Sequence, residues 1–234
     1  MRLAVTRPQP DAERTAQALR QRGHKVLIAP VVRIEPVAAN LAGQYAAVLI
    51  TSGNAVRALA GVGSRKSITS LPLFAVGARS AEAAREAGFT EVSSAEGNAA
   101  DLARLVAARC KGAAAPLLYL VGEDRAADLS APLKESGIAV KTAVIYRAAG
   151  LPLAPPLAAA LKAGAIDGVL HFSARSAAFY LAGARTAGLL AQALRPRHFC
   201  LSSQVAAPMG AAAAPYVAIA ARPDERALLE CVDY

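Results

Sequence analysis

Short apolar runs alternate with longer amphipathic stretches along the whole chain, and this alternation constrains the fold more than any other sequence feature. Strands are predicted at Leu3–Thr6, Val26–Ile28, Ala46–Thr51, Leu73–Val76, Glu91–Ser93, Leu117–Val121, Val140–Tyr146, Gly168–Phe172, His198–Leu201 and Val217–Ala220. The segments between them fit helices, for example Asp11–Arg22, Ala78–Ala87, Ala99–Arg109 and Asp224–Val232. Because such alternation builds parallel sheets with helices on both faces, the predicted class is α/β.

A weak internal repeat indicates how these elements are grouped. The segment Leu19–Val26 has the same spacing of leucine, glycine and valine as Leu133–Val140, and each lies in a strand–helix–strand unit. A longer unit, which runs strand, serine, helix, strand, helix, begins with Val48–Ser52 and again with Val169–Ser173. The order along the chain is therefore short unit, long unit, short unit, long unit.

The four units can form two similar sheets in two ways. Each short unit can join the long unit that follows it, or the first short unit can join the last long unit while the two middle units pair. The second, interleaved grouping needs two crossings, and prolines lie at both: Pro30 and Pro36 flank one, and Pro152, Pro155 and Pro156 follow the other. Proline prefers extended connectors, which favours the interleaved grouping.

Composition limits the class of partner. The 234 residues are 55% hydrophobic, which suits a real core in one large domain or two small ones. The formal net charge of +9 favours acidic partners. However, the basic residues are scattered, aromatic residues make up only 5% and Trp is absent. Nucleic acid is not the expected partner, because binding of single strands relies on aromatic stacking platforms.

Cysteine and histidine usage bears on compartment and metal. Cys110, Cys200 and Cys231 are widely spaced, odd in number and outside any CxxC motif, which is typical of buried thiols in a reducing cytoplasm. The three histidines lack ligand-like spacing, so no metal site is expected.

Neither a targeting segment nor a membrane span is expected. The chain begins almost at once with a strand instead of a charged region followed by a long apolar stretch. The most apolar segment, Val205–Ala221, is mostly alanine and is interrupted by Pro208, Gly210 and Pro215, so it is too weak and broken to cross a bilayer. We therefore expect a cytoplasmic protein that has no membrane partner.

Arg7 and Pro8 end the first predicted strand. Arg7 then faces the carboxyl end of a parallel sheet, where open α/β folds place their ligands. One interpretation is that Arg7 binds an anion. The other is a solvated turn in which Pro8 starts the helix, and the sequence does not separate the two.

Four further corners have the same construction, in which a buried strand ends and a helix opens. The free backbone N–H groups of such corners attract carboxylates or phosphates, although plain helix capping explains each corner equally well. In the first corner, Ser52 or Asn54 is expected to cap the helix. The candidate binding residues in these corners are Thr51, Ser52, Asn54 and Ala55; Gly77 and Ser80; Gly122, Glu123 and Arg125; and Ser173 and Arg175.

Other catalytic motifs fit poorly. Gly61–Lys66 has the wrong spacing for a phosphate loop and follows a helix instead of a strand. No GxSxG elbow occurs, and Glu123 and Asp124 are expected to cap a helix instead of acting as paired catalytic carboxylates. Tyr146 ends a predicted strand, where a tyrosine commonly anchors the sheet by packing. It is also the best single candidate for proton donation in the chain.

Taken together, these segments resemble the uroporphyrinogen-III synthase family, and their order and spacing match it across essentially the whole chain. The segments are Arg7-Pro8, Thr51–Val56, Val76-Gly77 with Ser80-Ala81, Leu118–Arg125, Ile145-Tyr146 and Phe172-Ser173. The resemblance implies the interleaved grouping, with two flavodoxin-like or Rossmann-like lobes, two neighbouring connectors and an active site in the cleft between the lobes. The implied limits are 1–33 plus 152–234 for lobe one, 40–146 for lobe two, and 34–39 and 147–151 for the connectors.

The region Cys200–Met209 departs from the family pattern. Family members usually have a glycine and a Thr-Ala pair after this strand, with a threonine hydroxyl near the position of Gln204 and Val205. Ser202 or Ser203 is the candidate to replace that hydroxyl.

The resemblance also implies an activity. The substrate is hydroxymethylbilane, a linear tetrapyrrole with eight carboxylates, whose terminal hydroxyl leaves. The last pyrrole attacks through its already substituted carbon, and a spiro intermediate recloses with that ring inverted, to give the type-III isomer. Because the chemistry is facile and needs mainly positioning, no cofactor is expected. Tyr146 is the implied donor to the leaving hydroxyl, and the implied state is a monomer that contacts the preceding pathway enzyme transiently.

Two other functions compete with this interpretation. A non-enzymatic module with two lobes that close on an anionic small molecule shares the architecture, and only the product of the reaction distinguishes it. A nucleotide-dependent Rossmann enzyme requires a glycine fingerprint that the sequence lacks.

Overall fold

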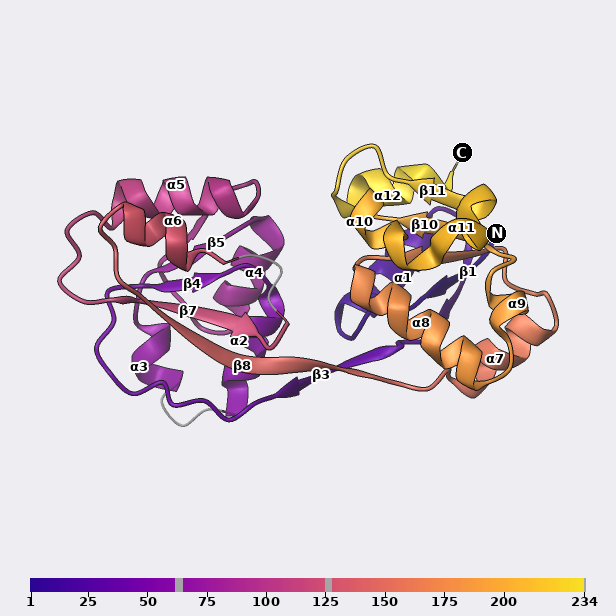
Figure 1. The fold of residues 1–234 in the computed structure, drawn as a ribbon, viewed down its shortest axis with the longest axis horizontal. Helices are drawn as coiled ribbons and strands as arrows, with labels where there is room; N and C mark the ends of the chain where they lie inside the picture. The colour runs from indigo at the N-terminus through magenta and orange to yellow at the C-terminus, as the bar shows by residue number, and fades with distance from the viewer. Residues whose placement is uncertain (62–64, 125–127, 234) are drawn as a thin grey trace. The chain divides into compact units, whose positions relative to one another are not determined.

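A computed structural model describes residues 1–61, 65–124 and 128–233 of the chain. The chain forms two compact units (Figure 1). Unit 1 consists of Met1–Arg33 and Ala149–Tyr234, and unit 2 consists of Ile34–Ala148. Unit 1 is thus built from the two ends of the chain, and unit 2 is one continuous segment.

Unit 1 contains a five-stranded sheet with the strand order β11-β10-β9-β1-β2. Every neighbouring pair in this sheet is parallel. The strands are β1 (Arg2–Val5), β2 (Lys25–Ile28), β9 (Gly168–His171), β10 (Arg197–Cys200) and β11 (Val217–Ile219).

Helices cover both faces of this sheet. They are α1 (Asp11–Gln21), α7 (Pro155–Lys162), α8 (Ala174–Thr186), α9 (Leu190–Ala193), α10 (Ser203–Ala206), α11 (Gly210–Ala213) and α12 (Glu225–Val232), with 3-10 turns η2 (Ala207–Met209) and η3 (Ala214–Tyr216). On one face, α7, α8 and α9 pack against Ala4 and Val169 of the sheet. On the other face, α1 and α12 pack against Leu3, Leu170 and Phe199. Successive residues of a strand thus pack into two separate core clusters, because their side chains point to opposite faces of the sheet.

Unit 2 contains a six-stranded sheet with the order β3-β8-β7-β4-β5-β6. Its strands are β3 (Val32–Pro36), β4 (Val48–Ile50), β5 (Leu73–Ala75), β6 (Val92–Ser94), β7 (Leu117–Gly122) and β8 (Val140–Gly150). Strands β4 to β8 pair in parallel. The helices are α2 (Gly53–Ala58), α3 (Arg65–Thr69), α4 (Ala78–Glu86), α5 (Ala99–Arg109) and α6 (Ser130–Glu135), with the 3-10 turn η1 (Leu59–Gly61).

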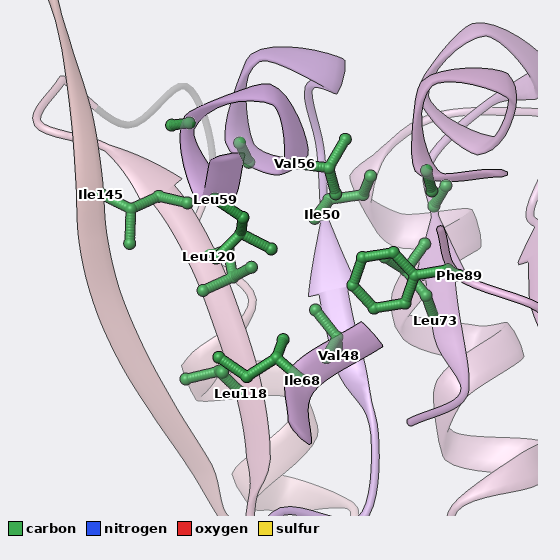
Figure 2. Packing of buried hydrophobic residues seen from close by; sticks show 14 of the residues in the cluster. Val48, Ile50, Val56, Leu59, Ile68, Leu73, Phe89, Leu118, Leu120 and Ile145 are labelled. Carbon is green, nitrogen blue, oxygen red and sulfur yellow. The ribbon is translucent and has the colours of Figure 1, made fainter. Parts of the chain in front are cut away.

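The core of unit 2 is also divided by its sheet. Figure 2 shows Val48, Ile50, Leu118, Leu120 and Ile145 on the sheet face that packs against α2, α3 and α4. The opposite face packs against α5 and α6. Burial of apolar side chains on both faces contributes roughly 1.5–3 kcal/mol for each large residue, which accounts for the uninterrupted apolar runs of the central strands.

Strands β3 and β8 lie side by side where the chain passes between the two units (Figure 1). The Val37 N–H donates to the Ile145 carbonyl (2.9 Å), and the Leu151 N–H donates to the Val31 carbonyl (2.8 Å). Residue numbers therefore rise along β3 as they fall along the paired β8, so the two strands are antiparallel. An ion pair between Glu35 and Arg147 (2.9 Å) links the same two strands.

The predicted α/β class, with two mostly parallel sheets and an interleaved chain order, is confirmed. Strands β1 and β2 join β9, β10 and β11 in one sheet, and not the strands β4, β5 and β6 that follow them in the chain. Residue 34, where the first connector is predicted to begin, lies inside strand β3, Val32–Pro36. Its neighbour β8 also runs four residues beyond the predicted end at Tyr146, to Gly150. An extended connector becomes a strand once a second one pairs with it.

Strand β8 contains a bulge where it pairs with β7. Val121 of β7 is level with Val144, whereas the next residue, Gly122, is level with Tyr146. A bulge places two residues of one strand opposite one residue of its partner, so the side-chain alternation is interrupted. Ile145 and Tyr146 consequently both pack against the cluster that includes α2.

Candidate active site

The candidate residues of unit 1 follow the carboxyl ends of neighbouring strands. Arg7 follows β1, Ser173 follows β9, and Ser203 follows β10. Because these strands are parallel neighbours in the order β10-β9-β1, the three residues lie along one edge of the sheet. This is the edge at which open α/β sheets bind ligands.

Arg7 lies in a compact ion-pair cluster. Its guanidinium is 3.4 Å from Glu225 Oε1 and 3.6 Å from Asp11 Oδ2, and it donates to Thr15 Oγ1 at 3.2 Å. It also lies 4.0 Å from the ring centroid of Phe172, a cation–π geometry. Its side chain is only 13% exposed. Arg7 is therefore not a solvated turn residue, and two internal carboxylates already offset its charge.

Serines organise the other two corners of this edge. The Ser173 hydroxyl accepts from the Ser176 N–H (3.1 Å) and caps α8, and it donates to the Ser176 hydroxyl. Arg175, in the first turn of α8, is half-buried. At the next corner, Ser202 caps α10 by accepting from the Val205 N–H (3.4 Å). Ser203 is exposed, so it is the more accessible of the two candidate replacements for the family threonine.

The first corner of unit 2 joins β4 to α2. Ser52, and not Asn54, caps the helix: its hydroxyl accepts from the Asn54 N–H at 3.2 Å. The Asn54 side chain instead accepts from Arg57 (2.7 Å). The hydroxyl of Thr51 lies 3.4 Å from that of Tyr119. These half-buried polar groups are held by local hydrogen bonds at the end of a central strand.

Ala55 belongs to the core at this corner. Its side chain is buried in the core cluster between the sheet and α2, α3 and α4, and its N–H donates to the Ser52 carbonyl at 3.1 Å. The preceding Gly53 is required by packing, because a Cβ there would lie 2.9 Å from the Cβ of Ala83 on α4. The close approach of α2 to α4 thus depends on small residues.

The corner between β5 and α4 is formed mainly by backbone. Gly77 precedes α4 in an extended conformation, without a side-chain cap, and its carbonyl accepts from the Ala81 N–H at 3.1 Å. Ser80 is nearly buried on the first turn of α4, at 8% exposure.

The end of β7 brings Gly122, Glu123 and Tyr146 together. The Glu123 N–H donates to the Tyr146 carbonyl at 2.8 Å, which closes the ladder beyond the bulge. The Tyr146 ring packs against the core cluster that contains α2 and remains half-buried. Glu123 is exposed. Arg125, the remaining predicted residue of this corner, lies outside the described residues.

Sequence reasoning missed a buried histidine pair in unit 1. Nε2 of His171 lies 3.1 Å from Nδ1 of His198, both side chains are fully buried, and the Tyr180 ring packs edge-on against His171. Burial, and then the nearby His198, lower the pKa of His171 to about 3. Burial lowers the pKa of His198 to about 4, against a smaller opposing effect of a hydrogen bond with the Leu194 backbone. Only the parallel register of β9 and β10 reveals the pair, because 27 positions separate the two residues.

Glu225 is a second residue that sequence reasoning missed. It is the first residue of α12 and follows the N-cap Asp224, so in the sequence it looks like an ordinary acidic residue at a helix start. Its carboxylate accepts from Thr15 Oγ1 at 2.5 Å and pairs with Arg7, 218 positions away in the chain. Such a contact has no local sequence signal.

Neither a metal-binding cluster nor a membrane-spanning helix occurs in the described parts of the chain. Within residues 1–61, 65–124 and 128–233, no three His, Cys, Asp or Glu side chains gather in a way that could hold a metal ion. None of the helices in the same ranges has the length and apolar character that a bilayer crossing requires.

Comparisons with known proteins agree with this arrangement. The family model described as "Uroporphyrinogen-III synthase HemD" matches residues 13–230. The fold is similar to that of uroporphyrinogen-III synthetase from Helicobacter pylori 26695, with 18% identity, 99% of this chain and 98% of that chain covered, and a TM-score of 0.66. It is also similar to a mutant uroporphyrinogen III synthase from the extremely thermophilic bacterium Thermus thermophilus, with 19% identity, 100% and 96% coverage, and a TM-score of 0.52. No curated protein matches the chain significantly.

The two structural likenesses concern the fold, since their sequence identities are low. The family match is the stronger finding, because it extends over nearly the whole chain and includes both units. The chain therefore belongs to the uroporphyrinogen-III synthase family of cyclising lyases in tetrapyrrole biosynthesis.

Proposed function

We propose that this chain converts hydroxymethylbilane into uroporphyrinogen III and that the Tyr146 hydroxyl donates a proton to the departing hydroxyl of the substrate. The observation that carries the proposal is the position of Tyr146, whose phenol is half-buried at the carboxyl end of β7, beside the helix corners of unit 2. A phenol can both donate and accept a hydrogen bond, so it suits a leaving hydroxyl.

Proton donation releases the terminal hydroxyl as water and leaves an electrophilic azafulvene. The last pyrrole attacks through its already substituted carbon to form the spiro intermediate, which fragments and recloses with that ring inverted. The proton that the last pyrrole loses on closure balances the proton given to the leaving group. The enzyme's main task is to favour this attack over direct closure, which is a problem of positioning.

The carboxylates of the substrate are proposed to bind at the carboxyl edges of the two sheets. In unit 2 the binding groups are Thr51, Ser52, Asn54, the Ala55 backbone, Gly77, Ser80, Gly122, Glu123 and Arg125, and in unit 1 they are Arg7, Ser173, Arg175 and Ser203. The net charge of +9 supports attraction of a polycarboxylate. Because Asp11 and Glu225 already offset the charge of Arg7, its share of the attraction is smaller than that of an isolated arginine.

We further propose a cytoplasmic monomer that receives its substrate through a transient contact with the preceding pathway enzyme. All three cysteines are free thiols, which is typical of a reducing compartment. The substrate closes spontaneously to the wrong isomer, so a short transfer from the preceding enzyme is advantageous. The working limits of the two lobes are 1–33 plus 152–234 and 40–146, with 34–39 and 147–151 as connectors.

The decisive experiment identifies the product isomer. Hydroxymethylbilane is incubated with the purified protein and with buffer alone, the products are oxidised to porphyrins, and the type-I and type-III isomers are separated by chromatography. We expect mainly type III with protein and only type I in buffer. Type I alone, formed at the buffer rate, would refute the proposal. Substrate binding without type III would instead identify an anion-binding module.

A further inference from the structure

Gly122 occupies the position level with Tyr146, just beyond the bulge between β7 and β8. A Cβ built on Gly122 would lie 2.7 Å from two ring carbons of Tyr146, Cε2 and Cζ, and 2.9 Å from its hydroxyl oxygen. Apolar atoms normally approach to about 3.5–4.0 Å. The Tyr146 ring thus occupies the space that any side chain on Gly122 would need.

The tyrosine ring, and not the strand, would move if Gly122 became alanine. The backbone of Gly122 does not adopt a positive φ, so an alanine is permitted there. The atoms in the way form the far end of one side chain, the end that carries the hydroxyl. Restoring normal contact requires a displacement of roughly 1 Å, and a misplacement of that size can cost about 100-fold in rate at a reacting centre.

We propose that Gly122 is a positioning residue for the reaction: its missing side chain lets the Tyr146 ring lie against the end of β7, which fixes the place of the hydroxyl. This inference rests on the proposed function, because it gives the Tyr146 hydroxyl a role in catalysis. It assigns to Gly122 a task different from close approach of the backbone to a substrate carboxylate.

A double-mutant cycle tests the inference. Gly122→Ala should lower kcat for the type-III isomer, up to the loss of about five- to 150-fold expected of Tyr146→Phe, with a smaller change in KM. In the Tyr146→Phe background, the same Gly122→Ala change should lower kcat by less than about twofold further, because the hydroxyl that it displaces is already gone.

Gly150→Ala is the matched control, since Gly150 lies on the same strand β8 and also abuts an aromatic ring. A Cβ there would lie 2.7 Å from Cδ1 of Phe179 on α8. This variant has a similar steric conflict without involving Tyr146, and its kcat should stay at the wild-type value. Thermal unfolding of all variants reports any general loss of stability.

A second readout follows the ring without reference to activity. Fluorine NMR of protein labelled with 3-fluorotyrosine gives a resonance for Tyr146, assigned by its loss in Tyr146→Phe. We expect this resonance to shift in Gly122→Ala and not in Gly150→Ala.

The outcomes separate the inference from the function on which it rests. If Tyr146→Phe is slow but Gly122→Ala has normal kcat and an unshifted resonance, only the inference is overturned. If Gly122→Ala is slow to the same degree with or without the Tyr146 hydroxyl, Gly122 acts through its own backbone and the inference is wrong. If Tyr146→Phe has normal kcat, the proposed donor role fails, and the inference fails with it.

Discussion

Acidification should destabilise unit 1, because His171 and His198 are buried as neutral imidazoles. Their pKa values of about 3 and about 4 in the folded protein lie below the ordinary 6.5 of histidine. Between these limits the unfolded chain binds protons that the folded chain does not, so stability is fully present above about pH 6.5 and is lost as the pH falls.

The size of this effect follows from the two shifts. At about pH 5, the pH lies roughly 1.5 units below the pKa of a histidine in the unfolded chain. Protonation of each histidine therefore stabilises the unfolded chain by about 2 kcal/mol. The pair therefore costs about 4 kcal/mol between about pH 7.5 and about pH 5, a large part of a typical total of about 5–15 kcal/mol. Asp224 and Asp233, whose pKa values are lowered from 3.8 by hydrogen bonds, lose their contribution only at still lower pH.

The predicted loss of stability can be checked by hydrogen exchange and mass spectrometry at about pH 7.5 and about pH 5, after correction for intrinsic exchange rates. Protection of β9 and β10 should fall at about pH 5, whereas β4 and β7 provide an internal control, since all three histidines of the chain lie in unit 1. A His171→Gln/His198→Gln variant should lose most of this pH dependence. An unchanged free energy of opening for β9 and β10 in the wild-type protein, within about 1 kcal/mol, would refute the reasoning.

Three further predictions concern the site and the units. Tyr146→Phe should lower kcat about five- to 150-fold while the protein stays folded, as expected for loss of one hydrogen bond worth about 1–3 kcal/mol in the transition state; steady-state kinetics within about twofold of wild type would contradict it. Arg7→Ala should raise KM more than it lowers kcat, and should also lower the unfolding free energy by about 1–3 kcal/mol because Glu225 loses a cation; a wild-type KM removes Arg7 from the site. A fragment of residues 34–148 should unfold cooperatively on its own, because both core clusters of unit 2 lie within that segment; a non-cooperative thermal transition by circular dichroism would contradict it.

Helices with strong local signals are the easiest elements to predict from the sequence. The helix predicted over Ala99–Arg109 has these limits in the structure. Asn98 caps it by accepting from the Ala100 and Asp101 N–H groups, and the Asp101 carboxylate accepts from the Asn98 N–H in return. All of these groups lie within one helical turn, so the information that starts the helix is contained in four neighbouring residues.

The candidate site is predictable only in part. The corners after the strands can be located, because parallel strands place their carboxyl ends at one edge. Their internal contacts cannot: Ser52 and Asn54 are equal candidates for the cap in the sequence, and the structure decides for Ser52 because the helix begins at Gly53. The direction in which Tyr146 faces is not predictable either, since regular alternation would place it opposite Ile145.

The sequence alone determined the alternation of strands and helices, the two-sheet α/β class and the family, because periodicity, capping and corner motifs are local and repeat along the chain. The tertiary structure alone decided the neutralisation of Arg7 by Glu225, the burial of His171 against His198, and the contact between Gly122 and the Tyr146 ring. These contacts join residues distant in sequence, and their formation depends on strand register and on a one-residue bulge. Shifting a register by one residue turns every side chain of a strand to the other face, so no local pattern can specify such contacts.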